Sequence, residues 1–467
     1  MRCIRTQRKG ARLDLASREH DRSLVDPVVA VKLRAANDDR GGAMRRDAIV
    51  DLDKRRVWHP YTPMQRYIDA TDPLVIERAE GSRLFDVDGK SYIDGNASWW
   101  VALLGHRHAR LVAALREQSE RMCHVALAGI AHEPAARLAD ELCRVAPRGL
   151  ERVFFSDDGS TAVETALKLA LGFWHHRGQE GRKRFVALDG AFHGETLGAT
   201  ALGGVEVFRR PYAGVLLDCV HAPFPGDDEA YARAFEAMQR LVRDDADHIA
   251  AVVVEPIVQG AAGMRVYSSE YLGELRRLCD RYDVLLIADE VFTGYGRTGT
   301  MWACDHAGIA PDMMCLAKGL SGGILPMAAT LVNERVFRSF LGETFYYGHS
   351  YCGHPLGAAV ALEVLAIYRD EDIVARAQPK AARIAEAFAR LAHHPGVLRT
   401  RTLGMIGALD LADGGYLGEA GWRVYHEALR RGAYLRPLGD TVYITPPLNI
   451  PDDELDQLLG IVETSVG

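Results

Sequence analysis

The sequence predicts an α/β protein with a mainly parallel sheet flanked by helices, together with a smaller second domain. Three observations predict this fold class. Short apolar runs alternate with helical stretches, which is the pattern of parallel strands joined by crossover helices. The chain has 467 residues, enough for two or three domains. From about Pro379 the pattern changes to helices followed by two short strands, which indicates the smaller domain.

Each expected strand of the large domain is a short apolar run that ends in a turn or loop. These strands cover residues 152–159, 184–190, 249–256, 284–291, 313–319 and 328–333. The clearest helices follow the first and third strands, over residues 160–176 and 269–282. Residues 433–448 are expected to form the strand pair of the smaller domain. Because ligands bind outside the carboxyl ends of such strands, the functional residues are sought there.

Composition excludes several functional classes. A net charge of −7 gives no reason to expect nucleic acid or an acidic membrane surface as a partner, and no apolar stretch is long enough to span a bilayer. The eight cysteines are scattered, which favours a reducing cytoplasm. His106 and His108 lack a third metal ligand, so no metal site is predicted. Residues 1–45 are rich in Arg and are expected to be a flexible extension, with Met44 as one candidate start of the natural chain.

Two features at expected strand ends suggest a phosphorylated, nitrogen-containing ligand. Gly159 and Ser160 lie at a probable helix start, where free N–H groups and the helix dipole bind phosphate, although an ordinary N-cap explains the serine equally well. Asp289 closes a very apolar strand, so its carboxylate needs a cation or a protonated ring nitrogen, with a structural salt bridge as the alternative.

A glycine pattern directly after Asp289 imitates a dinucleotide-binding fingerprint. Its glycines are Gly294, Gly296 and Gly299. The pattern is rejected because no amphipathic helix follows it and because the acidic residue precedes the glycines.

Lys318 and Arg436 are the remaining candidate site residues. Lys318 closes the next expected strand, so its amine is expected to share a cavity with Asp289, whereas on position alone it is a strand-end lysine whose ammonium reaches water. Arg436 carries a guanidinium suited to a carboxylate, and its alternative is a surface arginine. An amine, an acid partner and a phosphate-binding helix start are together what pyridoxal 5′-phosphate requires.

The segments LIADEVFTGYGRTG, CLAKGLSGG and VVVEPIVQGAAGM resemble the class III pyridoxal-phosphate aminotransferases. The resemblance implies the fold type I architecture of these enzymes, with a large cofactor-binding domain at residues 105–375. It also implies a small domain from both chain ends, at residues 46–104 and 376–467. By matching motif positions, Lys318 binds the cofactor covalently, Asp289 faces its ring nitrogen, Phe192 stacks on the ring, and Gly159 and Ser160 hold its phosphate.

A narrower resemblance concerns the substrates. The segments WHPYTPM, DGNASWWVALLGH and LRPLGDTVYITPP are similar to the branch of this family that transfers an amino group from S-adenosylmethionine to 8-amino-7-oxononanoate in biotin synthesis. The resemblance implies that Tyr61, Trp99, Phe192, Gly348 and Arg436 contact substrate. It also implies that Ser350 reaches the phosphate of a neighbouring subunit, so the active site needs a homodimer.

Trp99 and Trp100 are adjacent, and in a strand they point to opposite faces, so only one of them is expected in the pocket. Adjacent tryptophans are more often packing residues, and the resemblance selects Trp99 for the pocket.

Two departures from the branch bear on the amino donor. Phe192 stands where Tyr is frequent, which removes a phenolic hydrogen bond, and His349 replaces a proline beside Ser350. Lysine therefore remains an alternative donor, as does an ω-amine with a keto-acid acceptor. An aminomutase and a non-catalytic binding scaffold are alternatives of other classes.

Overall fold

The computed structural model describes residues 44–226 and 228–467 and divides into two units, Met1–Val75 and Ile76–Gly467. In the described part of the first unit, α2 (Arg46–Arg56) precedes α3 (Met64–Ala70). The Asp53 carboxylate accepts a hydrogen bond from the Tyr67 hydroxyl at 2.6 Å and lies 2.8 Å from Nε2 of His59, so it ties the connecting segment to α2. Residues 1–43 of the predicted extension lie outside the described residues.

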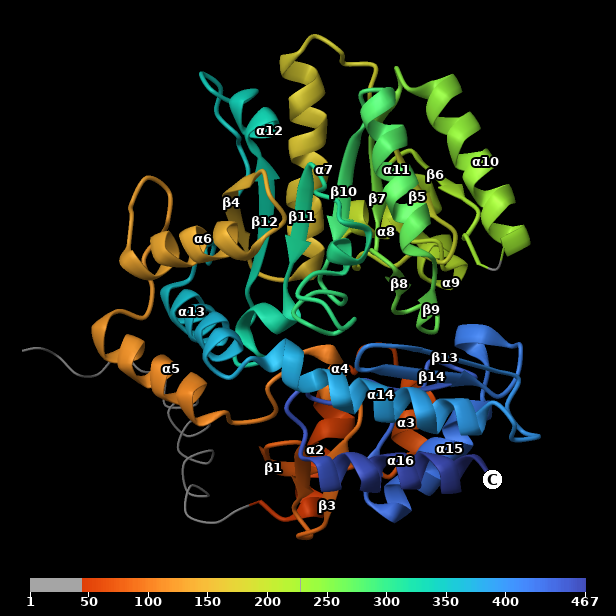
Figure 1. Ribbon diagram of the computed structural model, residues 1–467. Helices are drawn as coiled ribbons and strands as arrows, with labels where there is room; N and C mark the ends of the chain where they lie inside the picture. Colours follow the sequence, from red (N-terminus) through yellow and green to blue (C-terminus); the bar gives the residue numbers. More distant parts are fainter. Residues whose placement is uncertain (1–43, 227) are drawn as a thin grey trace, which may run out of the picture. The chain divides into compact units, whose positions relative to one another are not determined.

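The second unit is built on a seven-stranded sheet (Figure 1). In spatial order its strands are β4 (Leu150–Ser156), β12 (Ala328–Asn333), β11 (Met313–Leu316), β10 (Leu285–Asp289), β7 (Ile249–Val254), β5 (Arg184–Leu188) and β6 (Cys219–Ala222). All six predicted strands are present, and β6 was not predicted. Only β12 runs antiparallel to its neighbours, because the short connection from β11 holds no crossover helix. The predicted mainly parallel α/β fold is therefore confirmed.

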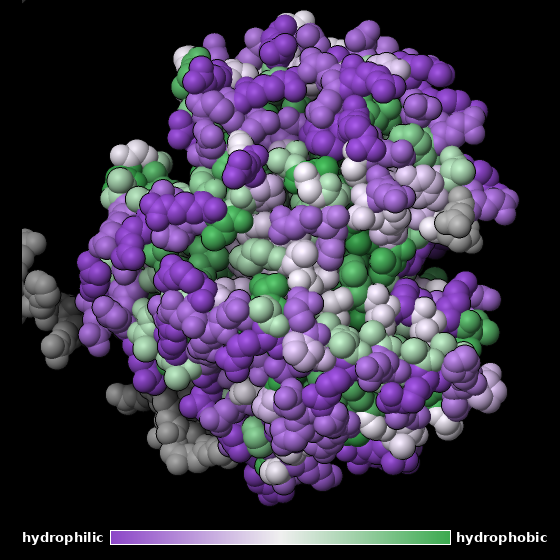
Figure 2. Space-filling view, in the orientation of Figure 1, coloured by the Kyte–Doolittle hydropathy of each residue, from purple (hydrophilic) through white to green (hydrophobic). Residues whose placement is uncertain are grey.

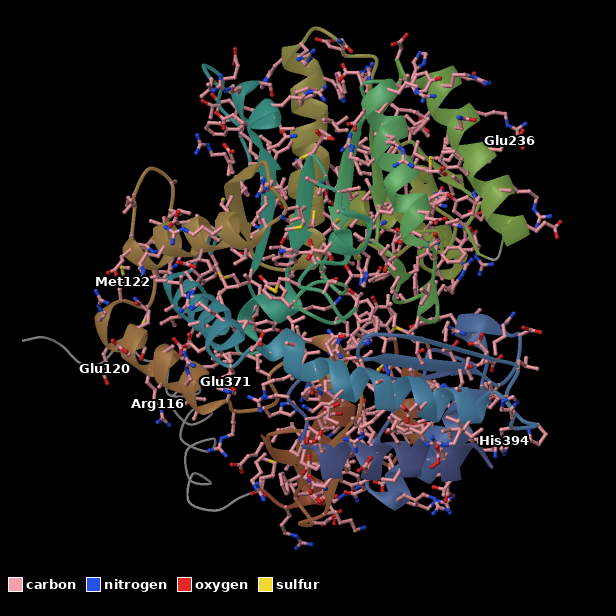
Figure 3. The ribbon with its side chains drawn as sticks, in the orientation of Figure 1. Arg116, Glu120, Met122, Glu236, Glu371 and His394 are labelled. Carbon is pink, nitrogen blue, oxygen red and sulfur yellow. The ribbon has the colours of Figure 1, made fainter. Side chains whose placement is uncertain are left out.

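Helices cover both faces of this sheet because its central strands are apolar on both faces. Val253 and Ile287 face α7 (Gly159–His176), whereas Val252 and Leu286 belong to the core under α10 (Asp228–Asp245) and α11 (Ser269–Arg281). Hydrophilic residues dominate the surface over α10 (Figure 2), and Glu236 projects from that helix away from the sheet (Figure 3).

Three more helices, α5 (Ala109–Arg121), α6 (Glu133–Val145) and α13 (Pro355–Asp370), pack beside the β4 edge of the sheet. Arg116 and Glu120 on α5 point outward (Figure 3). Short helices connect the strands: α8 (Leu197–Leu202), α9 (Glu206–Arg209) and α12 (Glu334–Arg338). Within the described part of the chain, no helix has the length and apolar character needed to cross a bilayer.

Three small sheets carry the remaining strands. One has the order β1 (Ile76–Glu80), β2 (Arg83–Asp86), β3 (Ser91–Asp94) and β15 (Ala433–Tyr434), and another has β13 (Arg399–Leu403), β14 (Ile406–Asp410) and β16 (Thr441–Ile444). A two-stranded sheet of β8 (Val258–Gln259) and β9 (Arg265–Val266) completes the strands. Three helices, α14 (Ile373–Leu391), α15 (Ala420–Arg431) and α16 (Asp452–Val466), lie with these strands (Figure 1).

The prediction that residues 433–448 form a strand pair is wrong. Both strands exist, but β15 pairs with β3 and β16 pairs with β14. Each strand pairs with a strand that is distant in the sequence, and the turn between β15 and β16 does not reveal such partners. Because β15 joins a strand from near the start of the unit, segments from both chain ends share one sheet, and the domain boundaries drawn from the sequence remain predictions.

We expect Ile287→Ala to destabilise the protein strongly, because Ile287 is fully buried in the central strand β10. The cavity and the lost apolar contact should lower the free energy of unfolding by about 3 kcal/mol. Chemical denaturation followed by circular dichroism measures this change. Leu398→Ala, at a residue that is 54% exposed, is the matched control and should change the unfolding free energy little. Equal losses in the two variants would contradict the burial of β10.

Candidate active site

The candidate site collects at the carboxyl ends of the parallel strands. β10 and β11 pair in parallel, with Asp289 opposite Cys315, so the segments that follow these two strands are neighbours. Lys318 lies just beyond the end of β11, at the start of a short 3₁₀ turn rather than on the strand itself. Asp289 and Lys318 are therefore side by side, as their positions in the sequence predicted.

The Lys318 amine lies in a poorly hydrated position against aromatic rings. Its Nζ is 4.7 Å from the ring centre of Trp100 and 6.0 Å from that of Phe292. Loss of hydration lowers the pKa of Lys318 to about 8, although the negative charges of Asp289 and Glu255 act in the opposite direction. A substantial fraction of this amine is therefore neutral near physiological pH, as a nucleophile or a proton acceptor must be.

Asp289 is paired with a histidine that sequence reasoning missed. One carboxylate oxygen lies 2.8 Å from Nδ1 of His193, and the other accepts the Val291 N–H at 3.1 Å. Burial disfavours a charged His193, but the hydrogen bond and the charge of Asp289 outweigh it and raise the pKa of His193. The other ring nitrogen of His193, Nε2, is buried without a hydrogen-bond partner in the described structure. The sequence signal was its place directly after Phe192.

Glu255 is the second missed residue. It follows β7, is 5% exposed, and accepts the backbone N–H groups of Phe192 at 3.0 Å and Gly260 at 2.9 Å. Burial raises the pKa of Glu255 to about 7. The carboxylate thus fixes the backbone of the residue expected to stack on the cofactor. A glutamate that closes the apolar run VVVEP is the same signal that selected Asp289.

The two residues predicted to bind phosphate lie at the start of α7. Gly159 and Ser160 are its first two residues, so their N–H groups have no acceptor within the helix, and Asp158 caps the helix by accepting the Thr161 N–H at 2.9 Å. The Ser160 hydroxyl accepts the Glu195 N–H at 3.1 Å. A Cβ on Gly194 would lie 2.2 Å from that hydroxyl oxygen, so the turn admits only glycine.

These groups fit pyridoxal phosphate. The helix start supplies N–H groups for a phosphate, Lys318 supplies an amine of lowered pKa, and buried Asp289 supplies a carboxylate for a ring nitrogen. The specific roles of these residues stay predictions.

Trp99 and Trp100 do not lie on a strand, so that expectation is wrong. Ala97–Trp100 forms a turn in which all four residues have positive φ, from +46° to +74°. The Asn96 side chain holds its start by donating to the Tyr443 carbonyl at 3.1 Å and accepting the Arg436 N–H at 2.6 Å. These partners are distant in sequence, so the local pattern did not reveal the turn.

Because of this turn, both indoles contact predicted site residues. Trp100 lies against the Lys318 amine, and the Trp99 ring lies 5.0 Å from the guanidinium carbon of Arg436. Trp422 contacts the same guanidinium at 5.8 Å. Trp100 and Trp422 are therefore further residues that sequence reasoning did not place in the site.

The roles of three predicted site residues stay predictions. Tyr61 belongs to the first unit and adopts a φ of +51°. Gly348 and Ser350 lie in the connection between α12 and α13, where Nδ1 of His349 is 2.9 Å from an Asp157 carboxylate oxygen. That contact restrains the connection where the family places a proline, and the roles of Gly348 and Ser350 toward a neighbouring subunit remain predictions.

The rejected dinucleotide pattern has a structural role. Arg297, at its centre, is fully buried and donates hydrogen bonds to the carbonyls of Met405 at 3.3 Å and Pro446 at 2.7 Å. The loop continues into the short 3₁₀ segment Ala303–Ala307, not into a long helix. The loop thus joins the large sheet to the C-terminal strands.

Comparison with known proteins identifies relatives over nearly the whole chain. The family Aminotransferase class-III matches residues 67–466. An adenosylmethionine-8-amino-7-oxononanoate aminotransferase from Synechococcus elongatus is 43% identical over 420 residues, which cover 87% of this chain and 97% of the relative.

Comparison with solved structures identifies the same kinds of relative. The enzyme of the same name from Methanocaldococcus jannaschii superposes with a TM-score of 0.86 at 34% identity, covering 90% of this chain and 99% of the other. An amine transaminase from an uncultivated Pseudomonas species, in its PLP-bound form, gives a TM-score of 0.82 at 33% identity, with 88% and 98% covered.

Replacing His193 tests its link to Asp289. His193→Ala removes a hydrogen bond to a buried charged carboxylate, worth about 2 kcal/mol, so the affinity for pyridoxal phosphate should fall roughly 30-fold. Fluorescence titration of cofactor-free protein with the cofactor measures this loss. His248→Ala, at an exposed histidine, is the control and should bind normally. Unchanged affinity in His193→Ala would exclude a supporting role for His193.

The lowered pKa of Lys318 predicts pH-dependent cofactor uptake. Only the neutral amine attacks an aldehyde, so the rate of covalent uptake should rise about tenfold per pH unit and level off above a pKa of about 8. Stopped-flow absorbance of cofactor-free protein mixed with pyridoxal phosphate measures this rate, and Lys318→Ala should show no covalent phase. A plateau reached only above pH ~10, where an ordinary lysine titrates, would contradict the poorly hydrated position.

Proposed function

The chain belongs to the class III aminotransferases, which are pyridoxal-phosphate-dependent, and we propose that it transfers an amino group from S-adenosylmethionine to 8-amino-7-oxononanoate. The product of this step in biotin synthesis is 7,8-diaminononanoate. The pair formed by Lys318 and Asp289 at the ends of β10 and β11 is the observation that carries the reaction class. The names of the relatives and the position of Arg436 support the substrates.

In this proposal Lys318 is the proton carrier. When bound, pyridoxal phosphate supplies an aldehyde that takes up the amino group and a ring that withdraws electrons from the substrate carbon. The Lys318 amine, whose pKa is lowered to about 8, would accept a proton from the substrate carbon and donate it to the cofactor. The indole of Trp100 holds the amine in place when it is protonated, through a cation–π contact.

The other site residues orient and hold the cofactor. Asp289, braced by His193, presents a fixed negative charge to a protonated ring nitrogen. Gly159 and Ser160 bind the phosphate at the start of α7, and Phe192, fixed by Glu255, covers one face of the ring and excludes water.

Arg436 serves the substrate. Its guanidinium lies near the indoles of Trp99 and Trp422, where it can bind the terminal carboxylate of the acceptor through two hydrogen bonds. Trp99, which is 38% exposed, also offers an indole face to the sulfonium or adenine of S-adenosylmethionine. The same pocket thereby receives two dissimilar molecules in turn.

We include in the proposal a cytoplasmic homodimer in which Gly348 and Ser350 enter the site of the neighbouring subunit and Tyr61 lines the substrate pocket. The exposed position of Ser350 is compatible with such an exchange. Among the described residues all seven cysteines are unpaired, as suits a reducing compartment.

Lysine as the donor, with the same acceptor, is the second candidate. Phe192 favours it, because this residue lacks the hydroxyl that the S-adenosylmethionine-dependent branch often carries. The backbone position of Phe192 is fixed by Glu255 in either case, so at this residue the two donors differ only in what the missing hydroxyl would have bound. The replacement of a proline by His349 is the second departure that leaves the donor open.

Supplying each donor separately tests the proposal. Cofactor-loaded protein is mixed with S-adenosylmethionine or with lysine, and the absorbance of the cofactor is followed. We expect S-adenosylmethionine to produce the spectrum of the aminated cofactor, and subsequent 8-amino-7-oxononanoate to restore the original spectrum. Borohydride reduction and peptide mapping, as a control, should place a pyridoxyl group on Lys318 and on no residue of Lys318→Ala. Conversion by lysine alone would select the second candidate, and conversion only by alanine or an ω-amine would refute both.

A further inference from the structure

A loop of the C-terminal region closes around a buried carboxylate. Residues 411–420, which we name the Asp440 loop, connect β14 to α15. One Asp440 oxygen accepts the Gly414 N–H at 2.7 Å, and the other accepts the Ala420 N–H at 2.9 Å. Asp440 is 3% exposed, so its buried carboxylate holds Gly414, within the loop, and the start of α15 together. A negative charge at the first turn of α15 also complements the helix dipole.

The Asp440 loop carries one aromatic ring that packs against a residue of the large sheet region. Tyr416, near the middle of the loop, packs edge-to-face on Phe208, with ring centres 4.9 Å apart and planes at 79°. Phe208 lies on α9, between β5 and β6, and is therefore a residue of the large sheet region. The contact thus joins the large sheet region to the C-terminal strands.

This aromatic pair lies between two residues expected to contact the substrate, Phe192 and Arg436. Phe208 packs against Phe192, the predicted cofactor-stacking residue, at 5.8 Å. At the other end Tyr416 lies within the electrostatic reach of Arg436, whose charge opposes the rise that burial causes in the pKa of Tyr416. The rings of Phe192, Phe208 and Tyr416 are therefore in successive contact, and the last of them lies within electrostatic reach of Arg436.

We propose that Tyr416 and Phe208 form the outer wall of the substrate pocket and select a long unbranched chain that ends in a carboxylate. An apolar chain that runs from Phe192 to Arg436 passes the whole wall and loses its hydration there, whereas a short carboxylate held at Arg436 contacts little of it. Arg436 binds the carboxylate of the substrate. The affinity then depends on how much of the apolar chain contacts the wall, and therefore on the length of that chain. The acceptor named in this inference rests on the proposed function, but the length selection does not.

Binding of two simple carboxylates tests the wall without turnover. Calorimetry on the cofactor-loaded protein compares nonanoate, which has the length of the proposed acceptor, with propionate, which does not extend along the wall. We expect Tyr416→Ala and Phe208→Ala each to weaken nonanoate binding about 10-fold or more and to weaken propionate binding much less. Leu417→Ala is the matched control, because Leu417 is the next residue of the same loop and is 72% exposed. This control should bind nonanoate like the unmodified protein.

Steady-state kinetics provide a second readout. Asp440→Asn keeps the shape of the side chain but turns a donor toward a backbone N–H, so the loop should loosen. We expect the KM for 8-amino-7-oxononanoate to rise about 10-fold in Asp440→Asn and Tyr416→Ala, and to stay unchanged in Leu417→Ala.

Several results would overturn the inference: no nonanoate binding to the unmodified protein, equal losses for both carboxylates, or an equal loss in Leu417→Ala. If the unmodified protein fails to aminate 8-amino-7-oxononanoate but still loses nonanoate affinity in Tyr416→Ala, the proposed function is wrong and the length-selecting wall stands.

Discussion

The site depends on one constraint, the burial of several ionisable groups within a single low-dielectric region. Lys318 has a lowered pKa because its amine is poorly hydrated, and it is kept there by aromatic rings and by two nearby carboxylates. Those carboxylates are stabilised in turn, Asp289 by His193 and Glu255 by two backbone N–H groups. Burying an unpaired charge costs several kcal/mol, so the removal of one member changes the protonation of the others. Lysine chemistry and the integrity of this cluster are therefore inseparable.

The parallel sheet explains why these groups meet. His193 follows β5, Glu255 follows β7, Asp289 ends β10 and Lys318 follows β11, so four successive strands of the sheet deliver their functional residues at the same edge. β4 runs in the same direction and leads into α7, which brings the predicted phosphate-binding helix start to that edge as well. Each residue is anchored on a buried strand, and only a short turn separates it from the rigid scaffold. Such placement holds reacting groups more precisely than a long loop does.

Residues with a left-handed backbone conformation also position the side chains of the site. Lys318 has a φ of +45°, and the turn at Ala97–Trp100 has four consecutive positive values. Each such residue costs about 1 kcal/mol or more, so surrounding contacts must maintain the conformation. At the tryptophan turn these contacts are the hydrogen bonds of Asn96 and the bond from the Trp100 indole N–H to the Tyr443 hydroxyl at 3.1 Å. The turn brings one indole to Lys318 and the other to Arg436, which joins the C-terminal strands to the cofactor site.

The sequence by itself determined the α/β class, the six predicted strands of the large sheet, the helix start at Gly159 and the side-by-side ends of β10 and β11. These features follow from local periodicity and from the rule that parallel strands share an edge, so no distant contact was needed. Tertiary structure alone decided that His193 braces Asp289, that Glu255 fixes Phe192, that Trp100 reaches Lys318, and that β15 and β16 join different sheets. The physical reason is that each of these depends on partners tens to hundreds of residues away, and such partners leave no local period in the chain.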